Sequence, residues 1–296
     1  MYPWHSQLSD FCQTSIDYLE AADRILKDRG DQTLQEQDSE WVSLSMARSL
    51  LLKAAEDLRA VACLDAAGLV GPTYAVARSL FEALVDMLYL VHSDASERHA
   101  RSLLVMCSSL VEDGCARILA AKIQRLAATE DAADYDSLQG EALAECLHSM
   151  RDQIAGLDLS EKDLKQLSEL VSSWERLASD HGHKALARIR GSARPGMRQR
   201  IKGVKEQHST PGVSKNLEFS YRVIYSQASA FVHSSGGVYL AGRGRPIEDL
   251  GPEPASFVVL VARDIVWMSN QIYGLGLPES VQSVLEKAKR TQDALS

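Results

Sequence analysis

The segment Thr73–Val91 reads TYAVARSLFEALVDMLYLV, and it decides the fold class. Its apolar residues fall on nearly every side of a helix, so this helix is expected to be buried. Pro72 precedes it and suits the first turn of a helix, where the missing N–H costs nothing. A helix buried on all sides needs other helices around it, and the segment therefore predicts a helical bundle.

Helical spacing of apolar residues continues in both directions from this segment. We expect an all-α protein, a bundle of about ten helices joined by short links. No internal repeat is present, which argues against a solenoid. The expected helices span residues 6–29, 39–67, 72–91, 94–128, 137–155, 160–179, 214–233, 254–273 and 278–295.

Two segments interrupt the helical pattern. Residues 181–213 contain several glycines and prolines and have no sustained apolar face, which predicts a mobile basic loop. Residues 235–254 are rich in glycine and proline and are expected to be irregular, with room for a short hairpin. We expect a single helical domain over residues 1–296, the alternative being two helical lobes with a boundary at 181–213.

Composition limits the cellular setting and the class of ligand. The net charge of −8 argues against a surface coated in positive charge for DNA or membranes. No signal peptide is recognisable at the start, and the longest apolar run of the C-terminal region, residues 257–262, is too short to span a bilayer. An odd number of widely spaced cysteines predicts reduced, buried thiols in a cytoplasmic protein, namely Cys12, Cys63, Cys107, Cys115 and Cys146.

The segment Thr73–Val91 carries three charged residues on its otherwise apolar helix. Arg78, Glu82 and Asp86 follow one another at steps of four, about one turn, so they share one face. A buried charge is costly unless it is paired and hydrogen-bonded. Arg78 and Glu82 can pair within the helix, and Asp86 then needs a donor from Tyr89 or from a facing helix.

A second polar stripe follows the predicted helix 214–233. Arg222, Ser226, Ser229 and His233 recur at steps of four, three and four, and Tyr225 borders them. Sites in helical bundles are commonly built from side chains on facing helices.

We therefore expect the two stripes to meet in a candidate site. His233 would serve as the general acid or base, and Arg78 or Arg222 would hold a phosphate or carboxylate. The alternative is that these groups only fix the helix register. The candidate catalytic residues are Arg78, Glu82, Arg222, Tyr225, Ser229 and His233.

Positive charge is concentrated in one segment. Between Asp180 and Glu206 there is no acidic residue but eight cations, while the rest of the chain sums to −16. Such a run is typical of a phosphate-binding surface, although it can also complement the protein's own acidic surface or that of a second subunit. The candidate nucleic-acid-binding residues are Lys184, Arg188, Arg190, Arg194, Arg198, Arg200, Lys202 and Lys205.

Several common site motifs are missing from the sequence. There is no Walker-type phosphate loop, no G-x-S-x-G elbow and no Cys-x-x-Cys pair. His181 and His183 have no thiolate partner nearby, so they are a poor candidate for a metal site. We expect no metal and no cofactor.

Two motifs resemble those of an uncharacterised bacterial all-helical family: Arg78-Ser-Leu-Phe-Glu82, and Tyr225-x-x-x-Ser229-x-x-x-His233. The resemblance covers residues 60–92 and 215–240. The chain also looks like HEPN-type helical domains, many of which are RNA-cutting toxins or parts of antiviral systems.

The resemblance to HEPN domains implies binding or metal-independent cleavage of RNA in bacterial stress or phage defence. HEPN enzymes place an arginine four to six residues before a histidine on one helix. Here ten residues lie between Arg222 and His233, so Arg78 is the better candidate for the arginine. Two alternatives stay open: a non-catalytic, homodimeric interaction protein with a protein partner, and a small-molecule sensor that uses the space between the polar stripes.

Overall fold

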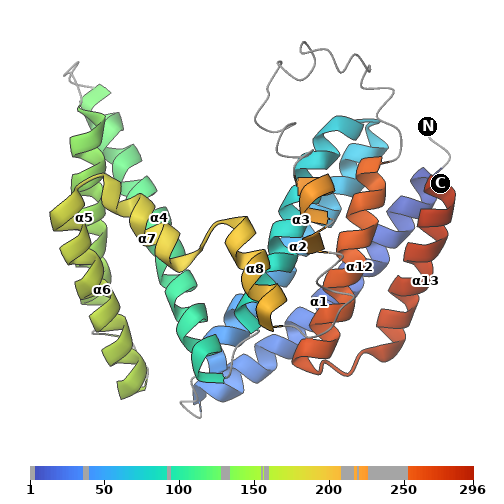
Figure 1. Ribbon diagram of the computed structural model, residues 1–296, viewed down its shortest axis with the longest axis horizontal. Helices are drawn as coiled ribbons and strands as arrows, with labels where there is room; N and C mark the ends of the chain where they lie inside the picture. Colours follow the sequence, from blue (N-terminus) through green and yellow to red (C-terminus); the bar gives the residue numbers. More distant parts are fainter. Residues whose placement is uncertain are drawn as a thin grey trace. The chain divides into compact units, whose positions relative to one another are not determined.

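The structure is a computed structural model that describes residues 4–35, 40–91, 95–127, 134–154, 156, 160–207, 217–218, 220–225 and 253–296. Within these residues every regular element is a helix, which confirms the predicted all-α bundle (Figure 1). The elements are α1 (His5–Gln35), α2 (Glu40–Ala66), α3 (Val70–Val91), α4 (Ala95–Ala127), α5 (Tyr135–Ile154), α6 (Glu161–His181), α7 (Lys184–Ala193), α8 (Met197–Gln207), the π-helix η1 (Tyr221–Tyr225), α12 (Glu253–Tyr273) and α13 (Pro278–Leu295).

The chain divides into two compact units. Unit 1 contains residues 1–29, 47–92 and 197–296, and unit 2 contains residues 30–46 and 93–196. Unit 1 therefore holds α3, α8, η1, α12 and α13, and unit 2 holds α4 to α7. The described part of the chain contains no helix long and apolar enough to cross a bilayer.

Helix α12 forms the centre of unit 1, where it packs against both α3 and α13 (Figure 1). Its buried residues lie on nearly every side, from Ala255 to Met268. The Tyr18 hydroxyl of α1 lies 3.1 Å from that of Ser269, and burial raises the pKa of Tyr18 to about 12. At the end of α12, Gly274 takes a φ of +54° and its carbonyl accepts from Arg29 at 3.0 Å.

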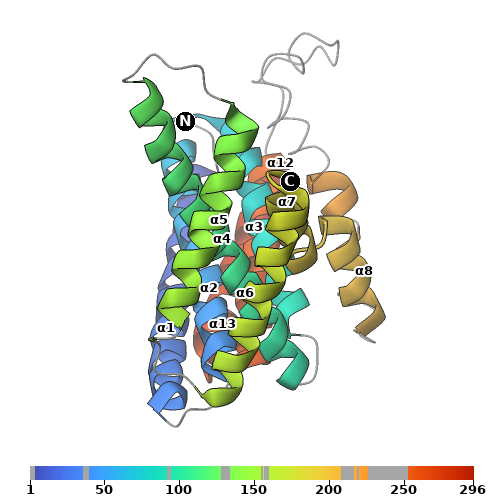
Figure 2. The same ribbon diagram turned by 90° about the vertical axis from the view of Figure 1, so that its left-hand side faces the viewer.

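Helices α4, α5, α6 and α7 form the core of unit 2 and lie side by side in Figure 2. Ser160 caps α6 by accepting a hydrogen bond from the Asp163 N–H at 3.2 Å. The Asp163 carboxylate forms a hydrogen bond with Nε2 of His99 on α4 at 2.8 Å, and both side chains are almost fully buried. This pair fixes α6 against α4.

The expected loop at 181–213 is helical over 184–193 and 197–207. The prediction was wrong here because each helix has only a short apolar face. Ala185, Ile189 and Ala193 are the buried residues of α7, and the buried face of α8 is equally short. Tertiary packing of a short face is enough to select a helix that its own composition does not favour.

Helix α1 also differs from expectation, because it continues through Gly30 to Gln35. A Cβ at Gly30 would lie 3.8 Å from that of Leu44 on α2, an ordinary van der Waals contact. The thiols are buried as predicted with one correction, since Cys63 is exposed on α2. Burial raises the pKa of the Cys12 and Cys107 thiols to about 12, which makes them poor nucleophiles.

Gly114→Ala is expected to lower the free energy of unfolding by about 1 to 2 kcal/mol. A Cβ at this position of α4 would lie 2.5 Å from Sγ of Cys146 on α5, and the Cys146 side chain is buried. Urea unfolding of the full chain measures the change.

The control for this variant is Gly191→Ala in α7, where a new Cβ has nothing within 4 Å and is expected to stabilise the helix. Adding Cys146→Ala to Gly114→Ala should restore part of the loss, because the clashing sulfur is removed. Wild-type stability of Gly114→Ala would contradict the close approach of α4 and α5.

Candidate functional site

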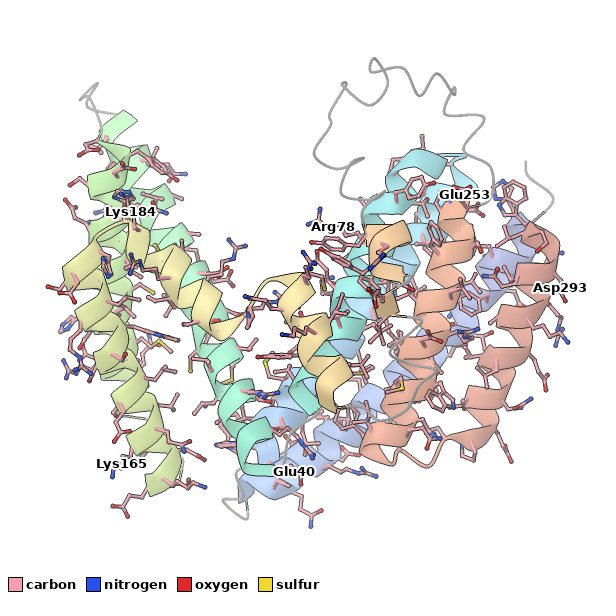
Figure 3. The ribbon with its side chains drawn as sticks, in the orientation of Figure 1. Glu40, Arg78, Lys165, Lys184, Glu253 and Asp293 are labelled. Carbon is pink, nitrogen blue, oxygen red and sulfur yellow. The ribbon has the colours of Figure 1, made fainter. Side chains whose placement is uncertain are left out.

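The candidate site lies in unit 1, where Arg78 of α3 meets η1 (Figure 3). Arg78 donates from Nε to the Glu82 carboxylate at 3.0 Å, as expected for residues one turn apart. Its Nη2 donates to the Tyr225 hydroxyl at 3.2 Å, and the guanidinium lies over the Tyr225 ring, 4.7 Å from its centroid. Arg78 and Tyr225, which are 147 positions apart in the chain and both belong to the predicted site, are therefore in contact.

Three aromatic rings continue outward from this contact. The Tyr225 ring packs at a tilt on buried Phe81, with centroids 6.2 Å apart. The Tyr225 ring also stacks on the Tyr221 ring, with centroids 5.3 Å apart and an interplanar angle of 23°. Phe81 is fully buried, whereas Tyr225 and Tyr221 are half-buried.

Asp86 obtains its partner from a facing helix, one of the two sources predicted. Arg200 of α8 forms an ion pair with it through Nη1, and both residues are buried. Burial lowers the pKa of Arg200, while the nearby Glu82 carboxylate and Tyr225 hydroxyl raise it. Because an arginine stays charged at ordinary pH, this pair anchors α8 to α3 beside the candidate site.

Arg200 is therefore a correction to the predicted nucleic-acid-binding set. It is 6% exposed, and its guanidinium is engaged inside the unit instead of facing a phosphate in solution. Of the others, Lys205 lies in α8 but its side chain is outside the described part. The remaining six are exposed: Lys184, Arg188, Arg190 and Arg194 in unit 2, and Arg198 and Lys202 in unit 1.

Not all predicted catalytic residues join Arg78. Arg222 is 74% exposed and pairs with Glu218 at 2.7 Å, so it contributes to the outer surface of η1. Ser229 and His233 lie outside the described residues, as do Ser226 and the irregular segment up to residue 252. The described contacts thus bring together Arg78, Glu82 and Tyr225 of the predicted set.

Helices α7 and α8 are each amphipathic and basic. In α7 the buried face is apolar and every charged side chain is a cation on the exposed face. Arg190 reaches Glu112 of α4 at 3.4 Å, and a shallow open hollow of about 430 Å³ lies beside this pair. In α8, Arg198 and Lys202 lie one turn apart and are exposed, whereas Ile201 and Val204 are buried.

No group of three metal-ligating side chains occurs in the part of the chain that the structure describes. His181 lies 2.9 Å from the guanidinium of Arg188, and His183 lies 3.7 Å from the Asp136 carboxylate. The two histidines therefore have separate neighbours.

A model of a family of unknown function, DUF5677, matches residues 44–241, which is more than half of the chain. The chain belongs to this family. The membership agrees with the expected resemblance to an uncharacterised family. No curated protein and no solved structure matches the chain. The DUF5677 match spans α3, α8 and η1, and therefore contains the whole candidate site.

Sequence reasoning missed two parts of this candidate site. Tyr221 was not singled out, although it lies four residues before Tyr225 and that spacing was a usable signal. Phe81 was noted only as a member of the Arg78–Glu82 motif, without a role. The role of Arg200 was also missed. On a short amphipathic helix, the local sequence around a buried arginine resembles that around an exposed one. Only the packing of the folded protein shows which arginine is buried.

Proposed function

We propose that this protein binds RNA through the exposed basic faces of α7 and α8, as an HEPN-like helical protein of bacterial stress or phage defence. The observation that carries the proposal is the segregation of charge. From residue 181 to 205 there is no acidic side chain, and six of the eight cations are exposed. Phosphates of a nucleic-acid backbone are the partners that such helices attract, even though the whole chain is acidic.

The choice of RNA over DNA rests on the resemblance to HEPN domains. Cleavage is a further step that needs a general acid or base. Arg78 is the candidate to hold a phosphate, because its guanidinium is a planar group of N–H donors and its side chain is 21% exposed. His233 would supply the proton transfer, and Glu82 would orient Arg78 through their hydrogen bond.

The experiment is a binding titration of labelled single-stranded RNA with the full chain at several KCl concentrations. The expected result is an affinity whose logarithm falls linearly with the logarithm of salt, by about 0.7 for each phosphate contacted. Absence of binding at low salt, or binding that salt does not weaken, would overturn the proposal. Equal or tighter binding of DNA of the same sequence would overturn RNA as the ligand.

The same titration separates the alternatives. An interaction protein would bind no RNA and would elute as a dimer or with a protein partner. A small-molecule sensor would bind no RNA and would gain thermal stability from a metabolite. Within the RNA proposal, His233→Ala should abolish any cleavage while leaving the affinity for RNA unchanged, which tests catalysis apart from binding.

A further inference from the structure

An open hollow of about 430 Å³ lies in unit 2, where α7 packs against α4 and α5. Sites that hold small molecules have volumes of about 300 to 1,000 Å³, so the hollow is large enough for a compact ligand. Helix α7, whose first residue Lys184 is labelled in Figure 3, supplies most of the wall. The hollow is therefore part of one of the two basic helices to which RNA binding is assigned.

The wall that α7 provides combines positive charge with apolar surface. Lys184 and Arg190 are exposed cations of this wall, and Leu186 and Ala187 lie between them in the chain. Lys184 forms no ion pair with a described residue, so its ammonium group is available to an anion. A cation beside an apolar surface suits a ligand that is anionic at one end and flat at the other, as a nucleotide is.

Two further polar groups of the hollow can recognise the edge of a base. The Glu112 carboxylate of α4 only accepts hydrogen bonds, and its Oε1 lies 3.4 Å from Nε of Arg190. The Gln139 amide of α5 both donates and accepts. Guanine is the base whose Watson–Crick edge offers two adjacent N–H donors, at N1 and N2, beside an acceptor at O6. A carboxylate and an amide in one hollow therefore complement guanine better than adenine, cytosine or uracil.

We propose that this hollow binds an unpaired guanine nucleotide of the RNA. Lys184 contacts its phosphate, and the base lies against Leu186 and Ala187. Glu112 accepts hydrogen bonds from the N1–H and N2–H groups of the base. This inference rests on the proposed function and adds a preferred base to it, which exposed cations alone do not provide. Because pairing in a duplex engages the Watson–Crick edge, the hollow takes only unpaired nucleotides.

The first test uses the unaltered full chain and oligouridine of about 12 nucleotides, with and without one guanosine at its centre. The guanosine is expected to tighten binding roughly fivefold to a hundredfold, which is the discrimination that a bidentate contact to a base provides. Raising KCl should weaken both RNAs and leave their ratio unchanged, because salt acts on the phosphate contacts and the base edge carries no net charge. Equal affinities, or an adenosine that acts as well as the guanosine, would overturn the inference.

The second test compares Glu112→Gln with the matched control Glu175→Gln. The two carboxylates are 35% and 28% exposed, belong to unit 2 and each pair with an exposed arginine. Either change removes one negative charge, so electrostatics alone predicts equal or tighter binding of both RNAs. Glu112→Gln is expected instead to lose most of the preference for guanosine, whereas Glu175→Gln keeps it. A wild-type ratio of affinities in Glu112→Gln would contradict the assigned role of this carboxylate and overturn the inference.

The outcomes separate this inference from the proposed function. If oligouridine binds in a salt-dependent way and guanosine adds nothing, RNA binding stands and the guanine site falls. If neither RNA binds, both fall. Free GMP is the last arm of the experiment: thermal stabilisation by GMP without any binding of RNA would assign the hollow to a free nucleotide and overturn the inference.

Discussion

Asp86→Ala is expected to lower the free energy of unfolding by about 3 to 5 kcal/mol, because it leaves the Arg200 guanidinium buried without its carboxylate. Both members of the pair are less than a tenth exposed, and they join α8 to α3. Burial lowers the pKa of Arg200, which means that removing the guanidinium from water disfavours its charged form. Urea unfolding followed by circular dichroism measures the loss.

Two controls distinguish the effect of leaving a charge buried and unpaired from the effect of any substitution in a helix. Glu286→Ala removes an exposed partner of Arg290 on α13 and should cost less than about 0.5 kcal/mol. The double variant Asp86→Leu with Arg200→Met removes both charges and should recover most of the stability lost by Asp86→Ala. If Asp86→Ala unfolds like the wild type, the pair is not buried as described.

Replacing the six exposed cations of α7 and α8 by glutamine is expected to weaken RNA binding more than a thousandfold near 0.1 M salt. Each lost phosphate contact removes about 0.7 from the salt slope for single strands, and the affinity falls accordingly. The Arg198→Gln and Lys202→Gln pair alone should cost roughly tenfold to thirtyfold. The six residues are Lys184, Arg188, Arg190, Arg194, Arg198 and Lys202.

A matched control changes the net charge equally at other exposed positions, on α1, α6 and α13. It should bind RNA within a few-fold of the wild type, because net charge acts only weakly at a distance through salt. Equal losses in both variants would mean that net charge, and not the α7 and α8 surfaces, governs binding. The control positions are Arg24, Lys27, Lys162, Lys165, Lys289 and Arg290.

The fold class and several contacts could be predicted from the sequence because they depend on local periodicity. The steps of four from Arg78 to Asp86 placed three charges on one face, and the Arg78–Glu82 hydrogen bond follows from that spacing. The contact between Arg78 and Tyr225 was also expected, since a polar stripe on a buried helix needs a polar neighbour.

The remaining features depend on tertiary packing that periodicity does not encode. Helices α7 and α8 bury short apolar faces, so their sequence looks like a loop until a surface is available to cover them. Arg200 was grouped with its exposed neighbours because the sequence of residues 184–205 does not indicate that α8 packs against α3. The same holds for the stack of Tyr221 on Tyr225, which needs the π-helical turn.

The most direct test of RNA binding at α7 and α8 is photo-cross-linking of the full chain to single-stranded RNA that contains 4-thiouridine. Mass spectrometry then identifies the peptides joined to the RNA. The expected cross-links fall in residues 184–193 and 197–207, and they disappear as salt is raised. Cross-links confined to α1, α12 or α13, or none above the level of an unirradiated sample, would contradict the account.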